Sequence, residues 1–404
     1  MRNTLVFTVM VLGFTQIFAW GSTYYLLAVL STPIAADIGL SIGWIVSGLS
    51  VGLMMAGLVS PYVGQQIAFR GGRPVLALSS VIIGFGLLLL SYTTSLEIYL
   101  ISWLIIGIGM GAGLYDPAFS TLGRLYGQNG RIAINALTLF GGFASTLCWP
   151  LAAYLEYHFG WRWTCFIFAS FQIVVSLPIY LLGLPNEIPK HSNNISASNI
   201  PEKIIVGSER KYHWGIFAIL SFTISLASFI STIMSVYLLT ILQDKGLTFY
   251  QAVSLGALIG PCQVLARAIE MVIAKYHQPI WTKLVSALSV ALGLIILWLG
   301  EIDVTFAIIF YGAGIGLESI ARGTLPLSIY GADRYPIIMG HLAMPSLIAQ
   351  ASAPALASLM ITSYGMNLTL IILLFSAIIN IVLVVVLFIQ LAFFKLHNPR
   401  YRIN

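Results

Sequence analysis

Long apolar runs follow one another along almost the whole chain, separated by short polar segments. Each run is continuous, and each is long enough to approach or exceed the ~20 residues that an α-helix needs to cross a bilayer. The strands of a β-barrel would be shorter and alternating. The twelve runs that we place are residues 5–31, 42–63, 75–92, 97–120, 132–157, 163–183, 213–242, 250–274, 281–299, 303–328, 337–362 and 366–394. The pattern predicts an all-α transmembrane protein of twelve helices.

Composition leads to the same class. Hydrophobic residues make up 59% of the 404 residues and charged residues 8%, whereas soluble domains carry ~25% charged residues. The first apolar run, from Leu5 to Leu30, exceeds the ~7–15-residue core of a signal peptide, so we expect it to be retained as a spanning helix. Cys148, Cys165 and Cys262 lie inside apolar runs without a CxxC pair, which predicts buried thiols and neither a disulfide nor a metal site.

The net charge of +6 indicates an orientation in the lipid bilayer and no nucleic-acid partner. Lys and Arg are retained on the cytoplasmic side of membrane proteins. An N-terminus placed inside puts sixteen basic residues, Lys283 among them, at or near the cytoplasmic face, two outside (Arg162 and Lys245) and Arg267 in mid-helix. We therefore expect both termini in the cytoplasm and a monomer in the cell membrane, which in a Gram-negative bacterium is the inner membrane.

One long polar stretch divides the helices six and six. Residues 185–212 are rich in Asn, Ser, Lys and Glu, which predicts a flexible cytoplasmic linker between an N-terminal bundle (1–184) and a C-terminal bundle (213–404). The two halves repeat each other weakly, since residues 37–41 return as 244–248 and Pro150 returns as Pro354. Parallel six-helix repeats of this kind place the solute site between the halves, which rock to give alternating access.

The short loop between the second and third runs carries a family pattern. It reads GQQIAFRGGRP from Gly64, and the chain resembles the major facilitator superfamily, whose pattern there is Gly-x-x-x-Asp-Arg-x-Gly-Arg-Arg. Gly64, Gly71 and Arg73 fit, but Ala68 replaces the Asp of the usual Asp–Arg gating contact and Gly72 replaces an Arg. The resemblance implies the major facilitator fold, with two pseudo-symmetric six-helix bundles and helices 1, 4, 7 and 10 around a cavity.

The eighth run contains the clearest polar stripe. Gly256, Gly260, Gln263, Arg267 and Glu270 recur at intervals of three and four, so they share one helix face. An ionisable side chain at mid-membrane costs ~2.5–3.5 kcal/mol and is a functional candidate by default. Arg267 would bind an anionic group in bidentate fashion, with Glu270 as proton carrier or switch partner. The alternatives are a permanent Arg267–Glu270 salt bridge or a pair that closes the cytoplasmic mouth.

The segment 260–267 resembles helix 8 of the monocarboxylate-transporter and oxalate:formate-exchanger branch, which carries a substrate-binding Arg at the position of Arg267. Gln263 stands where monocarboxylate transporters have an Asp, and their helix 1 Lys is missing here. In helix 11, where the exchanger adds a Lys, this chain offers His341 near the start and Gln350 further in. One positive charge at the site fits a singly charged anion better than a dicarboxylate, and we expect Gln263 and Gln350 at the site as well.

Two further acids lie inside predicted helices. Glu318 and Arg322 are four residues apart in helix 10, and they form either an ion pair with each other or a proton-coupling site at Glu318. Asp116 precedes Pro117, which disfavours a helical residue before it. A local break or cap there is one interpretation, and proton coupling through Asp116 is the other.

The first run presents Gln16, Trp20, Tyr24 and Tyr25 close together. These residues would form an aromatic wall around the solute if the first helix lines the cavity. The alternatives are helix packing and an interfacial aromatic belt, in which Tyr and Trp are enriched.

The chain has no GxxxxGK[ST] loop, HExxH motif or nucleophile elbow, so neither ATP hydrolysis, enzymatic activity nor a cofactor is expected. The sequence predicts a proton-coupled secondary transporter for a small, monocarboxylate-like organic anion. The alternative is an efflux antiporter for amphipathic drugs or metabolites. That alternative is weakened because Trp103 and Trp149-Pro150 stand where drug exporters carry an Arg and a Gly-Pro.

Overall fold

The computed structural model describes residues 2–186, 214–300 and 303–397, and residues 187–212 of the predicted linker lie outside them. All regular elements of the described residues are helical. The first half contains α1 (Arg2–Gly21), α2 (Leu27–Ile38), α3 (Ile42–Arg70), α4 (Gly72–Ser91), α5 (Leu96–Gly113), α6 (Tyr115–Tyr126), α7 (Gly130–Gly142), α8 (Ala144–Phe171) and α9 (Leu177–Gly183). The second half contains α10 (Trp214–Asp244), α11 (Phe249–Ala257), α12 (Ile259–Ile273), α13 (Pro279–Leu299) and α14 (Val304–His397).

Sharp backbone turns at three glycines divide two of the long helices into separate spans, although the helical hydrogen bonds run on through the turns. Gly160 divides α8, while Gly331 and Gly365 divide α14 into three spans. Their φ values of 79°, 72° and 80° are accessible to glycine at little cost, because it has no Cβ. Nine apolar stretches long enough to cross a membrane, counted over the described residues, thus become twelve spans. The predicted twelve-helix fold is confirmed.

Several spans are interrupted, and the break in the fourth was anticipated at Asp116-Pro117. The backbone of Leu114 is extended (ψ −156°) between α5 and α6. Helical continuity would require an N–H from Pro117 to the carbonyl of Gly113, and proline has none. The side chain of Gln16 replaces it, with Nε2 donating to Gly113 O at 2.6 Å. The break is therefore stabilised by a residue from α1.

The repeated sequence after the first and seventh spans forms a repeated turn. Gly39 (φ 75°) and Gly246 (φ 88°) both adopt the left-handed conformation. Ser41 and Thr248 then stand in extended backbone before α3 and α11, and Thr248 caps its helix by accepting from Gln251 N. The two halves therefore build the same structure at the same end of the molecule.

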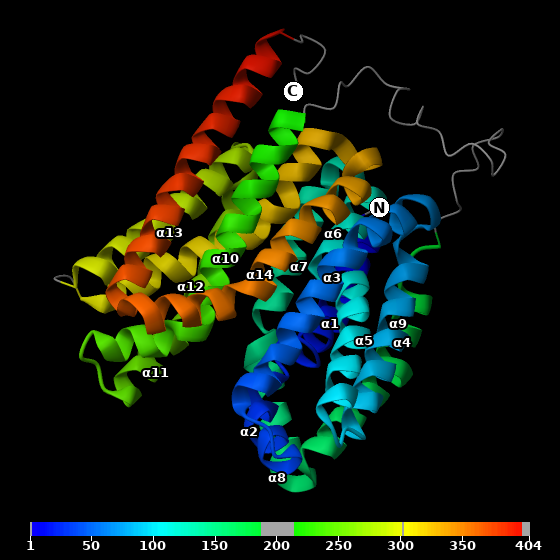
Figure 1. Ribbon diagram of the computed structural model, residues 1–404. Helices are drawn as coiled ribbons and strands as arrows, with labels where there is room; N and C mark the ends of the chain where they lie inside the picture. The colour runs from blue at the N-terminus through cyan, green and yellow to red at the C-terminus, as the bar shows by residue number, and fades with distance from the viewer. Residues whose placement is uncertain (1, 187–213, 301–302, 398–404) are drawn as a thin grey trace.

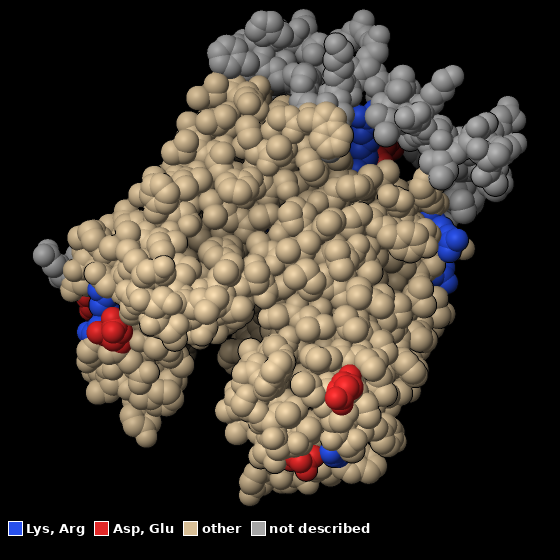
Figure 2. Space-filling view, viewed as in Figure 1, with Lys and Arg blue, Asp and Glu red and all other residues tan. Residues whose placement is uncertain are grey.

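The two bundles touch at one end and separate at the other. α3 and α14 cross where Gly64 meets Gly340, so closely that a Cβ on Gly64 would lie 3.1 Å from Gly340 Cα. We name this the closed end. We name the opposite end the open end. Figure 2 shows a notch there, between the lobe that contains α2 and the lobe that contains α11, and both helices are labelled in Figure 1. The middle of the visible face carries no charge (Figure 2), as lipid requires.

The loop between α3 and α4 contacts an arginine through its backbone. Arg124 of α6 donates from Nη1 to the carbonyl oxygen of Ala68. Ala68 therefore contributes a backbone oxygen at the position where the family pattern has a carboxylate.

Candidate functional site

Arg267 on α12 lies between the two bundles, and its side chain is 5% exposed. The guanidinium makes three hydrogen bonds, all to uncharged oxygens. Nη1 donates to Thr138 O in the other bundle at 2.7 Å, Nη2 to Gln263 Oε1 at 3.2 Å and Nε to Gly316 O at 3.4 Å. No carboxylate of the described residues lies within ion-pair distance of it. Arg267 is thus a buried cation without an anionic partner.

The C-terminal end of α7 holds the Arg267 guanidinium. α7 ends at Gly142, and a Cβ on Gly142 would lie only 3.0 Å from Arg267 Nη1. Phe143 keeps the helical conformation and α8 begins at Ala144, so the backbone stays helical beside Arg267. Backbone carbonyl oxygens of Thr138 and Gly316 therefore contact Arg267 where a carboxylate could stand.

Glu270 is bound to partners other than the one that its spacing suggested. Its carboxylate lies 3.5 Å from Arg131 Nη2 and 3.3 Å from His277 Nε2, and it accepts from Thr282 Oγ1 at 2.7 Å. The alternative of an Arg267–Glu270 salt bridge was therefore wrong. Because Arg131 belongs to α7, Glu270 links the two bundles at the closed end.

Asp116 and Arg322 form a second link between the bundles. Arg322 Nε and Nη2 donate to the two carboxylate oxygens of Asp116 at 3.0 and 2.8 Å, and Nη1 also contacts Ser346 Oγ at 3.1 Å. The alternative of a Glu318–Arg322 pair was wrong, because Arg322 crosses to α6. The predicted local break beside Asp116 is confirmed at Leu114.

Glu318 instead pairs with Lys283, a lysine expected at or near the cytoplasmic face. Lys283 is 1% exposed on α13, and its ammonium donates to Glu318 Oε1. Ser286 Oγ donates to Glu318 Oε2 at 3.0 Å. α13 begins at Pro279, so Lys283 lies one turn inside the helix, and its expected place at or near the cytoplasmic face stays a prediction. A weak signal for the burial of Lys283 is its place four residues after Pro279, which starts the helix.

Trp20, Tyr24 and Tyr25 cluster where α1 gives way to α2, and Tyr115 of α6 completes the group. Ring centroids lie 5.0 Å apart for Trp20–Tyr115 and 5.3 Å apart for both Trp20–Tyr24 and Tyr24–Tyr25. Tyr115 was missed, although it stands beside the Asp116-Pro117 break on a helix expected to line the cavity. We name these four residues the aromatic cluster.

The aromatic cluster and Arg267 are neighbours. Gly141 makes room for the Tyr115 ring, and the adjacent Gly142 makes room for Arg267. Arg267 is also close enough to the hydroxyls of Tyr25 and Tyr115 to act on both electrostatically. The structure therefore brings a cation and a set of half-buried rings to one region of the bundle interface.

Three glutamines were predicted at the solute site, and one of them, Gln263, accepts a hydrogen bond from Arg267. Gln16 is fully buried within its own bundle and is bonded to Gly113. Gln350 is half-buried beside Ala351, which packs in the core of the N-terminal half, and no described hydrogen bond joins it to Arg267. Gln16 therefore has a structural task in the N-terminal bundle, away from the guanidinium.

A model of the Major Facilitator Superfamily matches residues 12–340, well over half of the chain. The chain belongs to this superfamily. Its members are transporters, and the fold and the multiple apolar helices agree with a multi-pass membrane protein.

Curated relatives match a shorter part. The purine ribonucleoside efflux pumps NepI of Shigella sonnei (strain Ss046) and Escherichia coli (strain K12) are 30% identical over 172 residues. That stretch is 40% of this chain and 41% of either relative, so the match spans about two fifths of the curated proteins.

Solved structures match over nearly the whole length. The human organic anion transporter MFSD10 (TETRAN) has a TM-score of 0.75 at 14% identity, covering 94% of this chain and 99% of that one. The proton:xylose symporter XylE has a TM-score of 0.71 at 12% identity, and the match covers 94% of this chain and 95% of that one. Identities this low show the shared fold alone, and the monocarboxylate branch stays a prediction.

Proposed function

We propose that the protein is a secondary transporter that moves a small organic anion of single charge by alternating access, coupled to protons. The observation that carries this proposal is the unpaired Arg267. Asp116, Glu270 and Glu318 each have a cation within ion-pair distance, whereas Arg267 contacts only uncharged oxygens. A buried charge without a counter-charge is costly, and a bound anion relieves that cost.

The aromatic cluster supports the solute's apolar part. Binding sites for small molecules combine apolar and aromatic walls with a few polar groups that fix orientation. A carboxylate on Arg267 and Gln263 would place the rest of the solute against Trp20, Tyr25 and Tyr115. This arrangement favours a carboxylate with a planar or apolar body.

We assign the closed end to the cytoplasm, because the predicted basic loops lie there. The notch at the open end then faces outward and admits solute. We assign the coupling proton to Glu318, which is paired with the ammonium of Lys283. Glu270 and Asp116 instead serve the two links that hold the closed end together.

The test is uptake into proteoliposomes of radiolabelled benzoate and lactate, driven by an imposed pH gradient with the interior alkaline. We expect at least one acid to accumulate, a protonophore to abolish the accumulation, and Arg267→Ala to lose it. Lys275→Ala, which removes an exposed cation away from the site, should behave as wild type. Failure of both acids to accumulate would overturn the proposed substrate class.

A second candidate is efflux of an amphipathic metabolite such as a purine ribonucleoside. It is favoured by the four-ring aromatic cluster, which suits stacking on a nucleobase, and by the 30% identity to NepI pumps over 172 residues. Competition separates the candidates. Adenosine that displaces bound benzoate, or that is transported when benzoate is not, would favour the second.

A further inference from the structure

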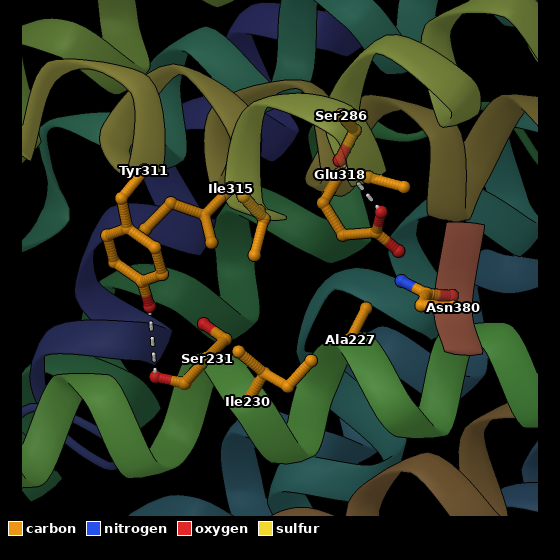
Figure 3. A pocket seen from close by; sticks show the side chains of 10 residues that line it. Ala227, Ile230, Ser231, Ser286, Tyr311, Ile315, Glu318 and Asn380 are labelled. Atoms are coloured by element: carbon orange, nitrogen blue, oxygen red, sulfur yellow. Dashed lines mark hydrogen bonds between the residues drawn. The ribbon is translucent and has the colours of Figure 1, made fainter. Parts of the chain in front are cut away.

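A small cavity lies inside the C-terminal bundle, apart from the bundle interface. It is enclosed by α10, α13 and two spans of α14, and it has a volume of about 10 Å³, which is room for roughly one water molecule. Figure 3 shows Glu318, Asn380, Tyr311, Ser231 and Ser286 around it.

The lining is polar and incompletely satisfied. Ser286 donates to Glu318 at 3.0 Å, and the Tyr311 hydroxyl reaches Ser231 O at 3.5 Å. Asn380 is 4% exposed, and its Oδ1 has no hydrogen-bond partner among the described residues. Figure 3 shows the amide nitrogen of Asn380 turned toward the Glu318 carboxylate. Buried polar groups are nearly always bonded to protein or ordered water, so this cavity is suited to water.

We propose that this cavity binds one water molecule, held by Asn380 and Glu318, through which the coupling proton reaches Glu318. The proposal rests on the coupling role given to Glu318 above. Either end of the Asn380 amide can bond the water, because the oxygen accepts and the nitrogen donates. A proton from solvent passes from hydronium to the Glu318 carboxylate, which leaves water and a neutral carboxylic acid. Lys283 keeps its proton, so the pair changes from neutral to a net charge of +1.

The charges around Glu318 make this step depend on the anion. Lys283 faces it from α13 and Tyr311 from its own helix, while α10 and the Asn380 span contribute neutral groups. Arg322, one turn further along α14, is paired with Asp116. A protonated Glu318 therefore leaves Lys283 as an uncompensated buried cation, which is costly.

An anion bound at Arg267 neutralises that residue, so it lowers the total positive charge of the protein interior when Glu318 is protonated. Arg267 contacts α14 at Gly316, two residues before Glu318. Anion and proton then favour each other's binding, and such coupling is reciprocal. Loading both adds no net charge to the protein, so the loaded carrier crosses electroneutrally.

The test follows the carboxylic acid band of Glu318 by infrared spectroscopy of the purified protein, after a jump to a pH acid enough to protonate Glu318 without the bound anion. The band is assigned by its loss in Glu318→Gln. Asn380→Leu removes the amide, and Ala227→Val fills the cavity without removing a polar group. We expect both to slow the appearance of the band about tenfold, the effect of one lost hydrogen bond. Ser376→Ala, in the same span but outside the cavity, should match wild type.

Wild-type rates in both cavity variants, or a wild-type protein without the band, would overturn the proposal. Ala227→Val alone decides the matter if Asn380→Leu does not fold. The readout needs no transported solute, so a failed uptake assay with a normal Glu318 band would overturn the anion substrate and leave the water site in place.

Discussion

Gly64 of α3 and Gly340 of α14 meet backbone to backbone, and their crossing closes one end of the bundle interface. A Cβ on Gly340 would lie 3.2 Å from Gly64 Cα, and one on Gly57 would lie 3.1 Å from Met344 O. Small residues allow helices to approach this closely in a membrane. The contact exists only while this end is closed, so added side chains here penalise one state of the carrier and not the other.

Gly340→Val should therefore shift the protein toward the state that is open at this end. The measurement is maleimide labelling of Ala332→Cys, which lies across the interface from Gly127. Labelling should be several-fold faster in the Gly340→Val background. Gly215→Val is the matched control, since nothing lies within 4 Å of a Cβ there. Equal labelling in all three backgrounds would show that the crossing does not control access.

The twelve spans were predictable because lipid requires long apolar runs and the chain supplies them. The breaks within the spans were less so, because distant groups stabilise them. The carbonyl of Gly113 loses its helical donor at Pro117, and the replacement comes from Gln16, 97 residues earlier. Asp116-Pro117 predicted a break in the helix, but nothing in the sequence near it indicated that Gln16 would donate the hydrogen bond to Gly113 O.

Charge pairing was predicted less well than position. Spacing along one helix suggested Arg267 with Glu270 and Glu318 with Arg322, yet each acid is paired with a residue of another helix. Neighbours at i,i+4 contribute only ~0.2–0.5 kcal/mol, so a better-placed partner on another helix outcompetes them. The position of Arg267 in the interior was foreseen, and its lack of an acidic partner was not.

The separate partners of Arg267 and Glu270 predict nearly independent effects on anion binding. Arg267→Lys keeps the positive charge but loses the planar guanidinium that binds a carboxylate in bidentate fashion, so the affinity for the anion should fall. Arg267→Ala should reduce the affinity further. Adding Glu270→Ala should not restore binding, because Glu270 is paired with Arg131 and His277. Affinity for benzoate in the two alanine variants and the double variant completes a cycle. We expect a coupling energy within ~0.5 kcal/mol of zero, and recovery in the double variant would make Arg267 a structural partner.

The Glu270 link should help to hold the closed end shut. Arg131, His277 and Thr282 face its carboxylate, and Arg131 belongs to the other bundle. Glu270→Gln keeps the volume of the side chain but removes its charge, so it should weaken the link and speed Ala332→Cys labelling several-fold. Lys275→Ala, which removes an exposed cation, is the control and should label as wild type. A wild-type labelling rate in Glu270→Gln would show that this link does not hold the end closed.

The contact of Gln16 with Gly113 makes the last prediction, because it separates a structural role from a solute-binding one. Gln16→Leu keeps the volume but leaves a buried carbonyl without a donor, which costs ~1–3 kcal/mol. We expect a lower melting temperature, while affinity for benzoate stays at the wild-type value because Gln16 does not contact Arg267. Gln263→Leu is the matched comparison, since Gln263 bonds the guanidinium directly, and it should weaken binding. If the Gln16→Leu protein keeps the wild-type melting temperature but binds benzoate more weakly, Gln16 is instead a solute-binding residue.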